Sequence, residues 1–366
     1  MARRFEFALA TDADDGELCA LLRQIAMPGN MTLAFLREPS FFLAEQAGST
    51  ASQVIICRDR QQGLVVGMGS RSLRCVYIDG QPTSVGYLSM LRGTPQARGS
   101  IGLARGYQYL KELHTDGLVP YYFTTILADN ADAVRLLTSG RAGLPTYQPV
   151  ARLITYLIPL TSKRRWQATF TGVSRGERGL LPQALTCLQE WNSRYQFAPV
   201  YTLQDLLGQS RMLPGFSWEH LYTYREQERV LGTLGVWDQQ AFKQTVVTAY
   251  SQKMQLLRPW YNLYAYARGI PRLPRAGASI PVLYAAFTSG DRCVFVRLLR
   301  QACADWSGQG YDYLSVGFCT DNACSAVAAR YATQRIASTV YLVSWPASAV
   351  VLPQTDWPVH LEIATL

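Results

Sequence analysis

The sequence predicts a mixed α/β (α+β) fold built as two similar domains in tandem, each a mixed, mostly antiparallel sheet flanked by helices. Three observations predict it. The chain has 366 residues, more than one ordinary hydrophobic core accommodates. Its composition, 48% hydrophobic and 17% charged, is typical of a folded globular protein. Strand, turn and helix patterns follow one another in the first half and recur in the same order in the second.

The first elements follow from local patterns. Side chains alternate at the start of the chain as in a strand, and Thr11 with the acidic residues after it caps a helix that carries Leu18 and Leu22. Asp79-Gly80 is a typical hairpin turn. The expected elements are a strand at 4–10, helices from Asp12 and at 31–36, strands at 53–58 and 64–74, and a strand at 83–92.

A turn-rich segment from Thr94 to Gly102 then begins a long helix that ends at Asp116-Gly117. A strand at 121–127, a short helix after Asn130 and a last strand near 147–158 complete the first half.

The second half repeats this order. Asp321-Asn322-Ala323 follows a strand as Asp129-Asn130-Ala131 does, and a strand at 282–287 leads to a helix that ends at Gly310. We therefore predict domains at 1–160 and 164–366, joined by the polar linker Thr161–Arg164. The second domain carries an aromatic-rich insertion near 251–280, whose stripe of aromatic side chains is expected to pack in a core.

Charge and cysteine content limit the classes of partner. The formal net charge is +9, but the basic residues are scattered, so anionic small molecules fit and a nucleic-acid partner is not expected. The eight cysteines form no C-x-x-C pair and there are three histidines, which predicts reduced cysteines and no metal site. No apolar run resembles a signal peptide or a membrane span, so we expect a cytoplasmic location and no membrane partner. The oligomeric state stays open.

The first half resembles the GNAT superfamily of acyl-CoA-dependent acetyltransferases. The resemblance rests on a strand, the Pro-x-x-Arg-Gly turn at Pro95–Gly99, a long helix, a second strand, and Asn130 with Ala133 three residues later. It covers about residues 4–158, and the internal repeat extends it to 164–350. The turn departs from the usual Arg/Gln-x-x-Gly-x-Gly/Ala pattern at Ile101.

The resemblance implies acetyl-CoA as cosubstrate. Backbone N–H groups at a helix N-terminus bind phosphate, and in this superfamily the turn holds the pyrophosphate of coenzyme A while the preceding strand binds the pantetheine arm. By position, the cofactor-binding residues are Leu91, Arg92, Gly93, Arg98, Gly99, Ser100, Ile101, Gly102 and Asn130. In the second half Asp291 stands where a phosphate would be repelled, so only the first domain is expected to bind coenzyme A.

Catalytic residues are less clearly indicated. The superfamily often uses a tyrosine about seven positions after the Asn as the acid, and Leu137 occupies that position here. Tyr147, Tyr121 and Tyr122 on neighbouring strands could replace it, and Tyr147 and Tyr122 are the predicted candidates. For a general base, the central strand offers no carboxylate, only Tyr87 and Ser89, so water or an acid of the second domain such as Glu226 stays open. The acceptor pocket is expected in the irregular segments 26–50 and 251–280.

The predicted function is N-acetyl transfer from acetyl-CoA to a primary amine of a small molecule or peptide. Two alternatives stay open. One is a non-catalytic acyl-CoA-binding protein, since the usual tyrosine is missing. The other is an aminoacyl-tRNA-dependent peptidyl transferase, which the net charge of +9 would suit.

Overall fold

The structure is a computed structural model that describes residues 4–95, 100–140, 143–162, 166, 169–345, 353 and 356–366. The elements of the first half are β1 (Phe5–Leu9), α1 (Asp15–Gln24), β2 (Met31–Leu36), α2 (Phe41–Glu45), β3 (Ala51–Asp59), β4 (Leu64–Ile78), β5 (Gln81–Gly93), α3 (Ser100–His114), β6 (Tyr122–Leu127), α4 (Ala131–Leu137) and β7 (Thr146–Pro159).

The elements of the second half are β8 (Val173–Arg175), α5 (Leu181–Asn192), α6 (Leu203–Leu206), β9 (Leu221–Glu226), β10 (Arg229–Asp238), β11 (Gln244–Tyr250), α7 (Gln252–Arg268), β12 (Val282–Ala286), α8 (Arg292–Trp306), β13 (Tyr313–Cys319), α9 (Ala323–Tyr331), β14 (Gln334–Ser344) and the 3-10 turn η5 (Ile363–Thr365).

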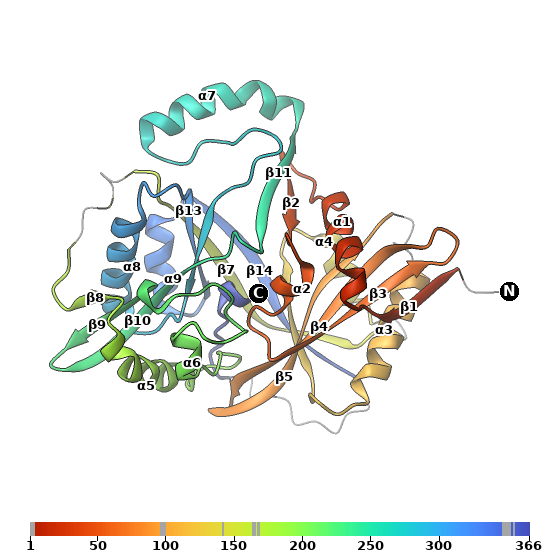
Figure 1. Cartoon of the computed structure of the whole chain (residues 1–366), viewed down its shortest axis with the longest axis horizontal. Helices are drawn as coiled ribbons and strands as arrows, with labels where there is room; N and C mark the ends of the chain where they lie inside the picture. The colour runs from red at the N-terminus through yellow and green to blue at the C-terminus, as the bar shows by residue number, and fades with distance from the viewer. Residues whose placement is uncertain are drawn as a thin grey trace.

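Among the described residues, twelve strands form one continuous sheet in the order β1-β3-β4-β5-β6-β14-β7-β13-β12-β10-β9-β8. The two halves exchange strands at its centre. β14, the last strand among the described residues, lies between β6 and β7 of the first half, where Thr339 is paired with Ile126 and Arg152. β7 in turn pairs with β13 of the second half (Figure 1). The sheet therefore crosses the predicted boundary at 160–164, and the division into domains stays a prediction.

The expected fold class, a mixed sheet flanked by helices in a repeated arrangement, is confirmed. Each half contains one parallel strand pair joined by a helix: β5 with β6 across α3, and β12 with β13 across α8. The first strand of each parallel pair has a residue with positive φ near its end: Met90 within β5 has φ of 54°, and Phe287 directly after β12 has φ of 53°. These matched irregularities are a structural counterpart of the sequence repeat.

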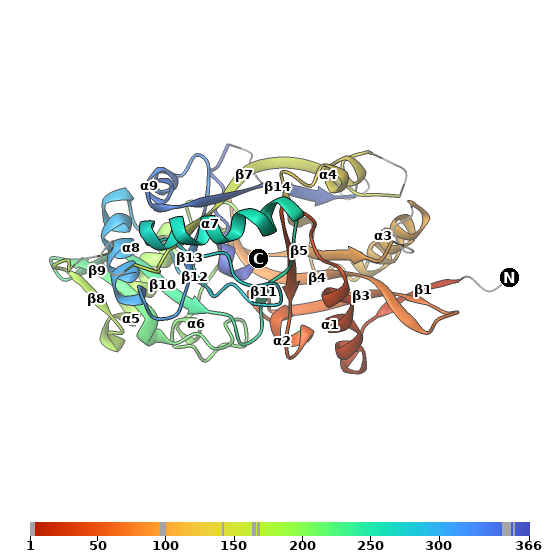
Figure 2. The same cartoon turned by 90° about the horizontal axis from the view of Figure 1, so that it is seen from above.

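Most local predictions agree with the structure. The hairpin turn before β5 has φ of 49° at Asp79 and 76° at Gly80, the positive values that a two-residue hairpin of this kind requires. In α1, Leu18, Leu21 and Leu22 face the core at helical spacing. Figure 2 shows α1 and α2 on one face of the first-half sheet and α3 and α4 on the other.

Two predictions about elements are wrong. Residues 31–36 form β2 instead of a helix, because they pair antiparallel with β11, more than 200 residues away. The aromatic stripe near 256–266 is not core: α7 stands outside the sheet layers (Figure 1), and Trp260 is 73% exposed. No helix among the described residues is long and apolar enough to cross a membrane.

Candidate functional site

β5 and β6 are paired over a short stretch and are unpaired beyond it, and we call the unpaired stretch the gap of the first half. Among the described residues they are parallel partners at Gly86↔Tyr122 and Tyr87↔Phe123. Side-chain hydrogen bonds add two contacts, from the Thr124 hydroxyl to the Leu88 carbonyl at 2.6 Å and between the Tyr87 and Thr125 hydroxyls at 3.3 Å. Within the described residues, no ladder pairing joins the rest of β5 to β6. The other edge of β6 is paired with β14. The strands therefore diverge from residue 89 onward, where β5 runs toward α3.

A β-bulge lies at the mouth of this gap. On the β4–β5 ladder, Ser70 pairs with Ser89 and Met68 pairs with Arg92, so Met90 and Leu91 together oppose the single residue Gly69. Such a bulge turns peptide groups out of the ladder and is common beside active sites. Predicted cofactor residues Leu91, Arg92 and Gly93 all belong to the bulged end of β5.

The predicted phosphate turn is only partly described. Arg98 and Gly99 lie outside the described residues, as do the side chains of Ser100 and Ile101, while Gly102 lies in the first turn of α3. That turn contains no acidic residue, which suits an anion. In the second half the Asp291 carboxylate caps α8 by accepting from the N–H groups of Cys293 at 2.7 Å and Val294 at 2.9 Å.

The equivalent gap of the second half is filled by the chain itself. Ile363 of η5 packs against the backbone of β13 so closely that a Cβ on Gly317 would lie 2.0 Å from its Cγ2 atom. Glu362 accepts a hydrogen bond from the Thr288 N–H at 3.3 Å, directly after the positive-φ residue Phe287. Burial raises the pKa of Glu362 to about 8. The chain's own segment thus fills the gap of the second half, and the Asp291 carboxylate caps α8, whereas the first turn of α3 has no acidic residue.

Asn130 and Leu137 both make contacts that stabilise the fold. The Asn130 side chain accepts from the Ala133 N–H at 3.2 Å and caps α4, next to the open end of β6. Leu137 is buried against α3 in the cluster that contains Leu110 and Tyr147. A leucine at this position fills a core site and offers no proton.

The two tyrosines predicted as acids both lie on the α3 side of the sheet. Tyr122 is fully buried, and its hydroxyl is paired with the His114 Nδ1 atom at 3.0 Å. Burial raises the pKa of Tyr122 to about 12. The hydroxyl of Tyr147 is hydrogen-bonded to that of Tyr107 on α3. Their catalytic role stays a prediction, and the structure gives both hydroxyls partners that also explain them as core residues.

A charged cluster that sequence reasoning missed lies on the opposite, α2 side of the sheet. The carboxylate of Glu45 is buried and is bound by the Arg37 guanidinium and the Ser70 hydroxyl. Burial alone would raise the pKa of Glu45, but Arg37, Ser70 and Arg74 together lower it, so the carboxylate is ionised. Because Ser70 and Ser89 are directly paired, their side chains share this face of the sheet beside the bulge.

Two further cations complete the cluster. Arg74 lies 4.1 Å from the centre of the Tyr87 ring and donates to the Thr365 carbonyl oxygen at 2.5 Å. Lys243, just before β11, donates to the Leu366 carbonyl oxygen at 3.1 Å. Burial, with Arg37 and Arg74 nearby, lowers the pKa of Lys243 to about 7. This part of the site therefore joins side chains of both halves.

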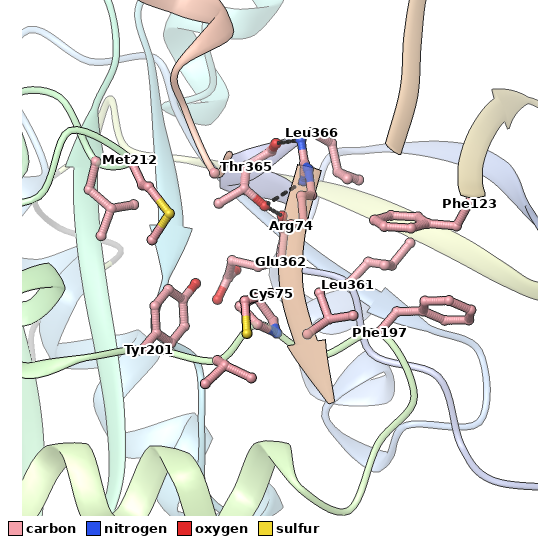
Figure 3. Close-up of a pocket in the computed structure, with 15 residues that line it drawn as sticks. Arg74, Cys75, Phe123, Phe197, Tyr201, Met212, Leu361, Glu362, Thr365 and Leu366 are labelled. Carbon is pink, nitrogen blue, oxygen red and sulfur yellow. Dashed lines mark hydrogen bonds between the residues drawn. The ribbon is translucent and has the colours of Figure 1, made fainter. Parts of the chain in front are cut away.

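A small cavity adjoins the cluster. It has a volume of about 30 Å³ and is lined by Arg74, Tyr201, Glu362 and Leu366 among others (Figure 3). Ligand pockets usually measure about 300–1,000 Å³, whereas a cavity of this size holds one or two water molecules. It is therefore a void between the C-terminal segment and the sheet, and we do not assign it to a substrate.

A sequence signal for this cluster existed but was not specific. Arg37 and Glu45 fall within the segment 26–50 that was expected to form the acceptor pocket, and Glu45 is the single acidic residue between Phe41 and Ile56. Lys243, one of four lysines, lies 198 positions from Glu45 in the sequence. Only the pairing of β2 with β11 brings that lysine to this face.

Comparison with solved structures identifies the fold. Saccharomyces cerevisiae N-myristoyltransferase with bound myristoyl-CoA matches with a TM-score of 0.63 and 11% identity over 99% of this chain and 90% of that chain. A second structure of that enzyme matches with a TM-score of 0.61 and 11% identity over 95% and 80%. A conserved protein from Enterococcus faecalis V583, described as a probable N-acyltransferase, matches with a TM-score of 0.50 and 9% identity over 93% and 72%.

No sequence-family model and no curated protein sequence matches the chain. At identities near 10% the structural likeness shows the fold alone. That fold is the duplicated GNAT-like arrangement of N-myristoyltransferase, and the fold expected from the sequence resemblance is thereby confirmed.

Proposed function

We propose that this protein is an N-acyltransferase that moves an acyl group from coenzyme A to a primary amine of a small molecule or peptide, with acetyl-CoA as the donor. One observation carries the proposal. In the first half, the gap between β5 and β6 lies beside a bulge, and the helix that follows β5 has no carboxylate in its first turn. In the second half, η5 fills the matching gap and the Asp291 carboxylate caps the matching helix.

Coenzyme A would bind in the first half only. Its pantetheine arm would extend along Leu91–Gly93, its pyrophosphate would bind at Arg98–Gly102, and Asn130 would lie at the far side of the gap. The fold that the chain shares with a myristoyl-CoA-bound enzyme supports this placement. The length of the acyl chain is part of the proposal and is tested below.

The charged cluster supplies a reason why an amine would react here. An amine attacks a thioester only in its neutral form, and most amines are protonated at pH 7. The one amine already in this cluster, Lys243, has its pKa lowered to about 7 by burial and by Arg37 and Arg74. An acceptor amine bound beside the same cations would lose its proton for the same reason.

The proposed transfer proceeds through a tetrahedral intermediate. The neutral nitrogen attacks the thioester carbonyl carbon, the carbonyl oxygen becomes an oxyanion, and peptide N–H groups at the Met90 bulge are the proposed donors to it. The oxyanion then re-forms the C=O double bond as the C–S bond breaks, and the coenzyme A thiolate that leaves takes up a proton from solvent. Glu45 is the proposed acceptor of the proton that the nitrogen loses, because its carboxylate is ionised and is joined through Ser70 to the face that carries Ser89.

Calorimetry and thiol release test the proposal. We expect acetyl-CoA to bind at one site per chain and free coenzyme A thiol to appear only when an amine is added; a parallel titration with myristoyl-CoA decides the acyl length. Gly99→Glu should abolish binding, because it adds a negative charge to the predicted phosphate turn, while the matched Asp291→Ala change in the second half should leave binding intact.

Three other results would contradict the proposal or favour one of the alternatives. Two sites per chain would contradict the filled second gap. Binding without amine-dependent thiol release would favour the non-catalytic acyl-CoA-binding alternative. Salt-sensitive binding of tRNA, with transfer of its aminoacyl group, would favour the peptidyl transferase alternative.

A further inference from the structure

α7 presents an apolar stripe to solvent. Leu256, Trp260, Leu263 and Tyr264 are spaced by four, three and one residues, which places them on one face of the helix. Their exposed fractions are 78%, 73%, 62% and 54%. Soluble helices normally turn such a stripe toward the core, so this orientation requires an explanation.

The orientation is fixed by the opposite face of the helix. Asn262 donates to the Leu273 carbonyl at 3.1 Å and accepts from the Leu273 N–H at 2.7 Å, which holds α7 on the loop that follows it. Arg258 donates to the same carbonyl at 3.3 Å. Ala265 on this face is fully buried. The apolar stripe is therefore held outward by polar contacts on the inner side.

The same segment is strongly basic. Residues 239–290 contain six basic and no acidic residues, in a chain whose net charge is +9. Lys253, Arg268 and Arg275 are exposed on α7 or on the loop after it. Arg272 is also exposed, but its charge is partly balanced by Asp312, which directly precedes β13, so Arg272 is not included in the basic surface. The surface thus combines aromatic and aliphatic side chains with positive charge.

We propose that α7 docks this protein on the surface of a membrane that contains anionic phospholipids. Exposed leucine, tryptophan and tyrosine side chains with flanking cations are the composition of helices that lie in the interfacial plane of a bilayer. α7 has 17 residues, and no described helix qualifies as a membrane span, so it would lie on the membrane and not cross it. It occupies the outer edge of the molecule in Figure 1, where a flat surface can reach it.

The observations favour a membrane over other partners. A surface for single-stranded RNA combines cations with aromatic rings on which bases stack, but here the aliphatic side chains of Leu256 and Leu263, on which no base can stack, are exposed on the same face. A second copy packed on the same stripe would bring Lys253 and Arg268 of each chain against like charges. An anionic bilayer accommodates both the apolar stripe and the cations.

Vesicle sedimentation of the full chain tests the proposal without any acyl-CoA. We expect binding to phosphatidylcholine vesicles that contain about 30% phosphatidylserine, and little binding to phosphatidylcholine alone. Trp260→Ser with Leu263→Ser should weaken binding at least tenfold. Leu64→Ser is the matched control, because Leu64 is 55% exposed on β4 away from α7. Lys253→Gln and Arg268→Gln should each weaken binding about fivefold.

Thermal unfolding is the control for folding, and we expect the variants to unfold near the wild-type temperature because the changed side chains are exposed. The proposal is overturned if the chain does not bind the anionic vesicles, or if the Trp260/Leu263 variant and Leu64→Ser bind equally well. It is also overturned if the wild-type chain forms a dimer that the Trp260/Leu263 variant dissociates while neither binds vesicles. Tight tRNA binding that the two serine changes leave unaltered, together with absent vesicle binding, would assign the basic surface to RNA instead.

Discussion

A buried carboxylate is costly unless it is paired, and Glu45 is paired with Arg37 and bound by Ser70. Such pairs contribute little net stability, because apolar side chains of similar volume often serve as well. Stability alone therefore does not account for a carboxylate beside the bulged strand. The proposed role in proton transfer gives it a chemical reason.

The first prediction concerns this carboxylate. Glu45→Gln should lower kcat by a factor of about 10²–10⁴, as for removal of a general base, while acetyl-CoA affinity measured by calorimetry changes little. The change leaves the Arg37 charge uncompensated, so the free energy of unfolding must be measured in parallel. Glu177→Gln, at an exposed glutamate, is the control. A folded Glu45→Gln protein with the wild-type rate would remove Glu45 from the mechanism.

A second residue, Glu362, should make stability depend on pH. Its folded pKa is raised to about 8 by burial, so between about pH 5 and 8 the folded state holds a proton that the unfolded state releases. Stability is therefore lost as pH rises through this range, by about 1.4 kcal/mol per pH unit from this group. Glu362→Gln keeps an oxygen for the Thr288 N–H and removes the titration.

The measurement is the difference in unfolding free energy between Glu362→Gln and wild type. From pH 5.5 to 8 it should shift by about 2–3 kcal/mol in favour of the variant. His360, whose pKa burial lowers to about 4, has an opposite pH dependence, but it is present in both proteins and cancels. A difference that does not change with pH would show that Glu362 is ionised throughout.

Among the elements, the parallel pair β5–β6 sets where the gap begins. Gly86 lies against the ring of Tyr122, and an added Cβ would be 2.0 Å from the Tyr122 Cδ1 atom. The ring is fully buried, and its hydroxyl is hydrogen-bonded to the His114 Nδ1 atom. Only glycine allows β5 and β6 to approach at this pair before they diverge.

Gly86→Ala should therefore destabilise the protein by about 3 kcal/mol, since the clash is with a fixed ring. Gly69→Ala on β4 is the matched control, because its nearest neighbour, the Leu91 Cδ1 atom, is 3.9 Å away. Its stability should be unchanged or higher by about 0.5–1 kcal/mol. Denaturant unfolding measures both, and equal stabilities of the two variants would contradict the packing argument.

Some of the elements could be predicted from the sequence and others could not. The Asp79-Gly80 turn and helix α1 depend on residues close in the chain, so local patterns predict them. β2 forms because it pairs with the distant β11, so local periodicity wrongly predicted a helix there. The apolar stripe of α7 has the periodicity of a core helix but is exposed, so periodicity wrongly predicted a buried environment. The resemblance pointed to Leu91–Gly93 as cofactor residues but did not predict the bulge beside them, and the approach of Lys243 to Glu45 also required the tertiary fold.

For the whole molecule, the strand exchange matters most. β14 supplies neighbours to both β6 and β7, and its side chains Val340 and Leu342 are buried in a core cluster that combines first-half residues such as Phe123 with second-half residues such as Phe197. Without the second half, β6 would lose one ladder partner and β7 both. The halves resemble each other as repeats, but neither contains all the strands that complete its own sheet.

The last prediction is that the two halves fold only together. A fragment of residues 1–162 should be unfolded or aggregated, because unpaired strand edges expose backbone donors and acceptors and apolar side chains. Co-expression with residues 163–366 should yield a soluble complex, and the intact chain should unfold in one calorimetric transition whose calorimetric and van't Hoff enthalpies agree. A 1–162 fragment with its own cooperative transition, or two separate transitions in the intact chain, would instead establish the halves as independent folding units and support a domain boundary at 160–164. The active site proposed here draws Glu45 from one half and Lys243 from the other, so a single cooperative unit is also what would keep its charges in place.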